Sequence, residues 1–255
     1  MQPDRFSVLG VGVSKLNLET AVDRVLGFVE KDDRGYVCVT NVHVVIEAQD
    51  DPELKRILND SLMTTPDGMP LVWVGRHLKR KREVSRVYGP DLMREVFAAG
   101  EKTGLKHFFY GGAEGVAEEL QEEMLRRFPN SEIVGTYTPP FRPLNQLEEA
   151  DLNEQLLEAK PDIIWVGLGA PKQEKFMAEQ IDKLPCKLMI GVGAAFDFYA
   201  GRVRQAPRWM QRIGLEWLFR LAQEPRRLLP RYIRTNPRFL ALLGRQLLAR
   251  RARAA

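Results

Sequence analysis

Two short polar stretches contain the side chains best suited to acid–base chemistry. In the segment TTPDGMP, Asp67 is the only charged residue and stands on a turn between Pro66 and Gly68. A carboxylate on a rigid turn can act as a general base, although an aspartate in front of a helix also commonly caps it. In the segment TNVHVV, Thr40 and Asn41 offer a hydroxyl and an amide, either to a ligand or to the following helix.

Glycine-rich segments mark a second group of candidates, for binding rather than for proton transfer. Gly111 and Gly112 lie in YGGAEG, where a predicted strand passes into a predicted helix. Gly169 lies in GLGAPKQEKF, shortly before Lys172 and Gln173. Backbone N–H groups at such positions can bind a phosphate. The segments together favour a nucleotide site, without indicating which nucleotide.

Metal chemistry has little support in the sequence. His43, His77 and His107 show no ligand spacing, and the chain contains no Asp-x-Asp pair to hold a divalent ion on a diphosphate. We expect no metal and no cofactor. A nucleotide diphosphate would then depend on arginines and helix N-termini for charge stabilisation.

The elements that must position these residues alternate along the chain. Apolar runs rich in β-branched and aromatic residues predict strands at residues 35–40, 105–112, 132–137, 161–169 and 186–193. Amphipathic periodicity predicts helices at residues 18–31, 90–102, 114–128, 146–160 and 171–183. This alternation predicts an α/β fold with a Rossmann-like, mostly parallel, doubly wound sheet. Ligands of such folds gather at the carboxyl ends of the strands.

The charge distribution separates the last part of the chain from the rest. Residues 202–255 contain 14 arginines, no lysine and two glutamates, a net charge of +12, whereas the first 201 residues carry 24 basic and 32 acidic side chains, or −8. We therefore expect a Rossmann-like catalytic core over residues 1–201 and a basic amphipathic helical appendage over residues 202–255. Such an appendage suits an anionic membrane surface and can complete an active site.

Two apolar stripes in the appendage bear on membrane contact. Around Trp217 the stripe either packs on the protein's own core or stays free for a membrane; its members are Ile213, Trp217, Leu218 and Leu221. The second stripe consists of Phe239, Leu243 and Leu247, and is predicted to contact the membrane because arginines flank it.

The two cysteines and the N-terminal segment indicate the cellular compartment of the protein. Cys38 and Cys186 lie in apolar runs, as expected of core residues in a reducing environment. No signal peptide is recognisable, and no segment approaches the ~20 apolar residues that cross a bilayer. These features predict a cytoplasmic protein, peripheral to the inner face of the cell membrane.

Taken in this order, the motifs resemble those of the WecG/TagA/CpsF glycosyltransferases, glycosyltransferase family 26. The resemblance covers about residues 8 to 240, and the matching segments are TNVHVV, TPDGMPLVW, VYGPDLM, YGG, GLGAPKQEKF and the stretch from GVGAAFDFYAG to LLPRY. It implies a metal-independent, inverting enzyme that moves a sugar from a UDP-sugar to a polyprenyl-diphosphate-linked sugar. Its products would feed surface polysaccharides such as teichoic acid linkage units or exopolysaccharide.

The resemblance also implies roles for individual residues. It assigns catalytic roles to Asp67, as the base, and to Thr40, the family's strand-end threonine. Its motif glutamine falls on Gln173, which is expected to bind substrate. Arginines of the appendage are expected to bind the diphosphate of UDP or of the lipid carrier: Arg220, Arg227 and Arg231, with Arg226 adjacent. The donor sugar, the acceptor sugar and the pathway remain open.

Three other interpretations compete with this one. An NAD(P)-dependent oxidoreductase shares the fold, but the segment LGVGVSKLN lacks the third glycine of a dinucleotide fingerprint. A non-enzymatic nucleotide- or lipid-binding scaffold would use the basic appendage for recruitment alone. Nucleic-acid binding lacks a recognition motif, and we expect none. The core is also expected to be able to self-associate as a homo-oligomer.

Overall fold

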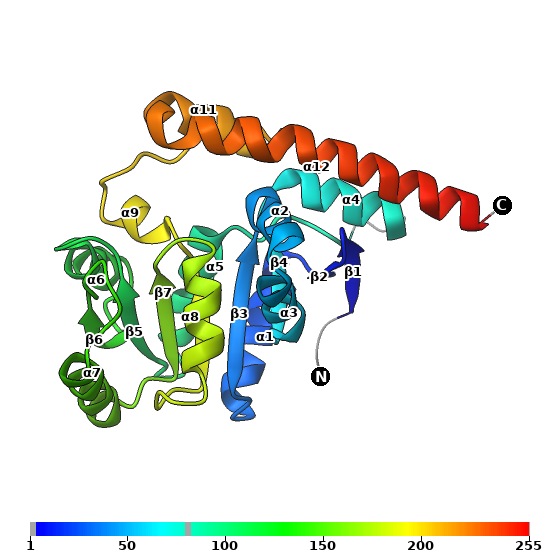
Figure 1. The fold of residues 1–255 in the computed structure, drawn as a ribbon. Helices are drawn as coiled ribbons and strands as arrows, with labels where there is room; N and C mark the ends of the chain where they lie inside the picture. The colour runs from blue at the N-terminus through cyan, green and yellow to red at the C-terminus, as the bar shows by residue number, and fades with distance from the viewer. Residues whose placement is uncertain (1–3, 80–82, 255) are drawn as a thin grey trace.

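A computed structural model describes residues 4–79 and 83–254 of the chain, and Figure 1 shows their arrangement. Six parallel strands form the central sheet. In sheet order they are β4 (Met63–Pro66), β3 (Gly35–Thr40), β8 (Leu188–Gly191), β7 (Ile163–Gly167), β5 (Lys106–Gly111) and β6 (Glu132–Tyr137). The predicted α/β, Rossmann-like fold is confirmed.

Helices cover both faces of the sheet, because the strands carry apolar residues on successive positions. One face packs against α1 (Leu18–Glu30), α5 (Gly89–Gly100), α6 (Val116–Arg127) and α9 (Ala195–Tyr199). The other face packs against α2 (Val42–Asp50), α3 (Pro52–Asp60), α4 (Met69–Lys79), α7 (Gln146–Ala159) and α8 (Lys172–Gln180). The alternating strand residues of β3 divide between the two cores, with Cys38 in one and Val37 in the other.

A short hairpin precedes this sheet and was not among the predicted strands. It pairs β1 (Arg5–Val8) antiparallel with β2 (Val11–Ser14). Leu9 and Gly10 form its two-residue turn with φ of 54° and 86°, the positive values that a type I′ hairpin turn requires. The glycines of LGVGVSKLN therefore belong to a hairpin and not to a phosphate-binding loop between a strand and a helix. This segment was the one most similar to a dinucleotide fingerprint, so it no longer supports the oxidoreductase interpretation.

The appendage consists of α10 (Arg208–Arg212), α11 (Glu216–Gln223) and the long α12 (Pro225–Ala254). Figure 1 shows α12 crossing the carboxyl ends of β3 and β4, beside α2, which it contacts. At its far end Gln246 accepts a hydrogen bond from the N–H of Leu9 at 2.7 Å and donates one to the carbonyl of Ser7 at 3.0 Å. The appendage thus lies over the carboxyl ends of the strands, where ligands are expected.

The second predicted stripe is not free for a membrane, which corrects that expectation. Phe239 is 2% exposed and packs in the core with Leu243 partly buried beside it, because α12 lays this face on α2. The first stripe is exposed instead: Ile213, Trp217 and Leu218 keep 41 to 52% of their surface open. Within residues 4–79 and 83–254, no helix is both long and apolar enough to cross a membrane.

Candidate functional site

The register of the sheet places Asp67 beside Thr40. Thr40 ends β3 and lies opposite Pro66, the last residue of β4, and the N–H of Asp67 donates to the carbonyl of Thr40 at 2.9 Å. Asp67 therefore follows directly on a strand end at the carboxyl edge of the sheet. This is the position that the fold offers to groups acting on a ligand.

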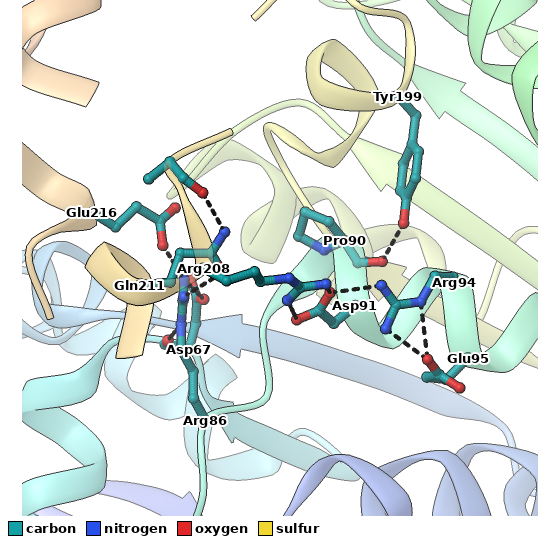
Figure 2. A network of polar contacts seen from close by, with 11 residues as sticks. Asp67, Arg86, Pro90, Asp91, Arg94, Glu95, Tyr199, Arg208, Gln211 and Glu216 are labelled. Atoms are coloured by element: carbon teal, nitrogen blue, oxygen red, sulfur yellow. Dashed lines mark hydrogen bonds and ion pairs between the residues drawn. The ribbon is translucent and has the colours of Figure 1, made fainter. Parts of the chain in front are cut away.

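The carboxylate of Asp67 faces a guanidinium and does not cap a helix. Its Oδ1 accepts a hydrogen bond from Nη2 of Arg86 at 3.3 Å, and Nε of Arg86 donates to the Asp67 carbonyl (Figure 2). No backbone N–H of the described residues donates to this carboxylate, and the first turn of α4 bonds to the Gly68 carbonyl instead. The capping interpretation of Asp67 is therefore wrong.

Burial makes Asp67 an unusually basic carboxylate. Its side chain is 17% exposed, and burial raises its pKa to about 6. The positive charge of Arg86 opposes this rise, and the negative charge of Glu216 adds to it. A carboxylate with a pKa this close to neutrality accepts a proton more readily than an ordinary aspartate.

Three residues around Asp67 were not singled out in the sequence: Arg86, Gln211 and Glu216. Arg86 donates to Glu216 of α11 in a short ion pair and to Oε1 of Gln211 at 3.3 Å. Its guanidinium also lies 4.0 Å from the ring centre of Tyr88. Arg86 directly precedes the VYGPDLM motif, which is the one signal that could have drawn attention to it.

Thr40 and Asn41 serve the local structure. Thr40 is completely buried, and its hydroxyl donates to the Cys38 carbonyl at 3.4 Å. The side-chain oxygen of Asn41 accepts from the N–H groups of His43 at 3.0 Å and Val44 at 3.3 Å. The capping interpretation of Asn41 is confirmed, since this oxygen satisfies the first turn of α2.

The glycines at the end of β5 are required by packing. Gly111 has a φ of 120° and lies opposite Gly167 of β7, where an added Cβ would come within 2.7 Å of the Gly167 carbonyl carbon. Gly112 has a φ of 81°, and a Cβ there would meet Val116 at 3.0 Å. Gly169 differs, because with a φ of 74° it has no heavy atom within 4 Å of the Cβ position. Of the three candidates, Gly169 leaves open space beside its backbone.

Gln173 and Glu174 form a buried polar pair behind this loop. The sequence places Pro171 as the first helical residue, but α8 begins at Lys172, which is exposed. Gln173 is 3% exposed and donates to Oε1 of Glu174 at 3.0 Å, and burial raises the pKa of Glu174 to about 7. Oε1 of Gln173 has no hydrogen-bond partner among the described residues. An unpaired amide oxygen in the first turn of α8 is a candidate acceptor for a ligand N–H or hydroxyl.

Three arginines of the appendage gather above the end of β3. Burial lowers the pKa of Arg231, and the positive charges of Arg227 and Arg220 lower it as well. Arg227 and Arg220 both pair with Glu224, the latter at 3.5 Å, whereas Arg231 makes no ion pair within the described ranges. Such a concentration of desolvated positive charge favours a bound anion.

The arginine cluster lies near His43, and Arg226 lies outside the cluster. Burial lowers the pKa of His43 to about 4, with the charges of Arg231 and Arg234 contributing, so these arginines lie near the first turn of α2. Arg226 is exposed and pairs with no carboxylate of the described residues. The structure therefore brings together three of the four expected arginines. No group of three or more His, Cys, Asp or Glu residues suited to a metal ion occurs in the described part of the chain.

Known proteins of similar sequence identify the family of this chain. The family described as the glycosyl transferase WecG/TagA/CpsF family matches residues 6–253. An N-acetylglucosaminyldiphosphoundecaprenol N-acetyl-beta-D-mannosaminyltransferase of Bacillus spizizenii is 30% identical over 211 residues, which cover 81% of this chain and 80% of the relative. A protein of the same name from Bacillus subtilis is 30% identical over 198 residues, or 78% and 75% of the two chains. With the family's motifs gathered at one edge of a Rossmann-like sheet and its pattern matched almost from end to end, this chain belongs to the WecG/TagA/CpsF family of glycosyltransferases.

Proposed function

We propose that this protein transfers a sugar from a UDP-sugar to a polyprenyl-diphosphate-linked sugar, with inversion at the anomeric carbon and without a metal ion. The names of the two relatives describe mannosaminyl transfer with a lipid-diphosphate-linked N-acetylglucosamine. The observation that carries the proposal is the basic carboxylate of Asp67 at the carboxyl edge of the sheet, on the side that the appendage covers with arginines.

In this mechanism Asp67 accepts the proton of the acceptor hydroxyl. The hydroxyl oxygen forms a bond to the anomeric carbon as the bond to the UDP oxygen breaks, and UDP leaves from the opposite face. Only Oδ1 of Asp67 is hydrogen-bonded to Arg86, so Oδ2 remains available for the proton. Proton transfer to a positioned base contributes ~10²–10⁴-fold to a rate.

The leaving diphosphate gains negative charge, which the arginine cluster would stabilise. Arg220, Arg227 and Arg231 come from two helices and reach the same region. Preorganised positive groups of this kind need no reorganisation when the charge develops. In the same proposal Gly169, Lys172 and Gln173 hold the donor on the other half of the sheet edge, with Gly111 and Gly112 supporting that loop.

The appendage would also bring the enzyme to its lipid substrate. Trp217 and Leu218 expose apolar surface on α11, and the arginines of α12 add positive charge near it. Aromatic and basic side chains together suit the interface of an anionic membrane. We therefore place the protein at the inner face of the cell membrane as a peripheral enzyme.

The test is UDP release with a short-chain polyprenyl-diphosphate-linked N-acetylglucosamine and a panel of UDP-sugars that includes UDP-N-acetylmannosamine. Acceptor-dependent release from one donor, lost ~10²-fold or more in Asp67→Asn, is the expected result. Asp60→Asn serves as the matched control, because it removes a carboxylate from the exposed end of α3 and should retain wild-type turnover. Equal turnover in Asp67→Asn and wild type would contradict the assignment of the base.

A further inference from the structure

Arg86 lies between two carboxylates that come from different parts of the chain. One is Asp67, at the end of β4, and the other is Glu216, the first residue of α11. Both contacts use the same nitrogen, Nη2, and the contact with Glu216 is the shorter one. All three side chains are between 14 and 17% exposed, so water screens their charges poorly.

One positive charge shared by two negative charges leaves the group with a net negative charge. Were Glu216 absent, Arg86 would neutralise Asp67 alone and hold it as a weak base. With Glu216 present, the guanidinium is divided between two partners. The proton affinity of Asp67 therefore depends on a residue of the appendage, 149 positions further along the sequence.

Neighbouring groups keep this arrangement in place. Gln211 of α10 accepts from Nη1 of Arg86 and donates to the Ala206 carbonyl at 2.7 Å. The turn that leads from α10 to Glu216 is closed by the N–H of Leu215, which donates to the Met210 carbonyl at 2.9 Å. The charge of Arg220 on α11 opposes the effect of Glu216 on Asp67, and the ring of Tyr88 supports the guanidinium from one side. Figure 2 shows Gln211, Glu216, Arg86 and Asp67 converging on one point.

We propose that Glu216 is a positioning residue that draws Arg86 partly away from Asp67, so that docking of the appendage turns Asp67 into an effective general base. This inference rests on the proposed role of Asp67. Undocking of α10 and α11 removes the second carboxylate and exposes Asp67 to water. The core then retains the aspartate but not its basicity, which confines efficient transfer to the docked state.

The experiment is the pH dependence of kcat/KM for UDP release by the full-length protein. In the wild type we expect the rate to fall below about pH 6, following Asp67. In Glu216→Gln the acidic fall should move about one pH unit lower, because a nearby negative charge is lost. The rate on the alkaline plateau should drop on the order of tenfold or less, since a weaker base accepts the proton less readily. Glu216→Asp, which keeps the charge, should restore the wild-type profile in large part.

Glu119→Gln is the matched control. It breaks the ion pair that Glu119 of the core makes at 2.8 Å with Arg202, at the start of the appendage. This pair also joins a glutamate to an arginine, but it lies far from Asp67 in the fold. Its profile should match the wild type. An unshifted profile in Glu216→Gln would overturn the proposal, and so would a uniform rise in rate at every pH, which would mean that Glu216 competes with the substrate for Arg86.

Failure of this inference and failure of the proposed function are distinguishable. If Asp67→Asn is inactive while Glu216→Gln keeps the wild-type profile, Asp67 is the base and Glu216 does not influence it. If Asp67→Asn turns over like the wild type, the base itself has been misassigned. Circular dichroism of each variant separates both cases from a loss of folding.

Discussion

The carboxyl edge of the sheet has two halves that are built in different ways. At β3 and β4 the site consists of charged side chains, Asp67 with Arg86 and Glu216, and the last of these comes from the appendage. At β5, β7 and β8 it consists of backbone brought close by glycines, such as Gly111 against Gly167. The first half depends on a contact made across the chain, whereas the second half depends on the sheet alone. Changes in the appendage should therefore affect chemistry, and changes in the glycines should affect folding.

The largest expected effect tests the charged half. Arg231→Ala removes a half-buried arginine that pairs with no carboxylate in the described part of the chain. We therefore expect kcat/KM for UDP release to fall ~10²-fold, as for the loss of one preorganised group at a developing charge. Thermal stability should not fall, since Arg231 is repelled by Arg227 and Arg220. Arg226→Ala is the control, because this exposed arginine lies outside the cluster. An equal loss of rate in both variants would point to general membrane attraction instead.

The next prediction tests the glycine half. Gly111→Ala places a Cβ within 2.7 Å of the Gly167 carbonyl carbon, and should lower the free energy of unfolding by about 1–3 kcal/mol. Urea denaturation measures the change. Gly244→Ala is an informative control, because this helical glycine has open space at its Cβ position and the substitution should stabilise α12 by up to about 1 kcal/mol. Unchanged stability in Gly111→Ala would show that the two strands can separate there.

Acid should also distinguish two buried groups, Asp67 at the carboxyl ends of the strands and His107 near the amino end of β5. His107 on β5 accepts from Nε1 of Trp165 at 3.2 Å, and burial lowers its pKa to about 3. As the pH falls below about 6.5, this histidine is protonated in the unfolded chain but stays neutral in the folded protein. The free energy of unfolding therefore decreases by about 1.4 kcal/mol for each pH unit below that value. Asp67 has the opposite sign, because its folded pKa is raised to about 6 and acid favours its folded form.

Urea denaturation at pH 7 and pH 5 measures this contrast. The loss of stability on acidification should be about 2 kcal/mol smaller in His107→Gln than in the wild type. In Asp67→Asn the loss should be larger than in the wild type, since the compensating carboxylate is gone. The same slope in all three proteins would contradict the assigned protonation states.

The smallest expected effect concerns Gly169. Its φ of 74° is unfavourable for other residues, so Gly169→Ala should cost about 1 kcal/mol of stability, without a clash. If this loop holds the donor, the KM for the UDP-sugar should rise while kcat changes little. A change in stability with an unchanged KM would assign the loop to folding only.

The sequence predicts the strands that are apolar on successive positions. Residues 132–137 and 35–40 match β6 and β3 to the residue, and the helices of the core follow their amphipathic periods. β4 was not among the predicted strands, because its four residues include two threonines and end in proline. The strands of the N-terminal hairpin were also not predicted, because each is only four residues long. Short strands carry too few residues to show an alternation.

The site was predictable to the extent that it is local. The sequence indicates a strand in front of Asn41 and a turn at Asp67. The structure shows that Asn41 caps a helix and that Asp67 does not. The Arg86–Glu216 contact joins residues 130 positions apart, so no local pattern contains it. The burial of Phe239 was likewise hidden, because an amphipathic period shows that a helix has an apolar face but not which surface covers it.

The order of strands in the sheet has a consequence for how the protein is made. β3 and β8 are neighbours within the large sheet, although they are its first and last strands along the chain. Roughly 150 residues separate them, so at ~5–20 residues per second the ribosome delivers β8 about 8–30 s after β3. β3 can pair early with β4 on one side, but the backbone N–H and C=O groups on its other side stay unpaired until β8 is synthesised. Unpaired groups of this kind can bind strands of other chains. We therefore expect the yield of native protein to depend on chaperones that shield the nascent chain.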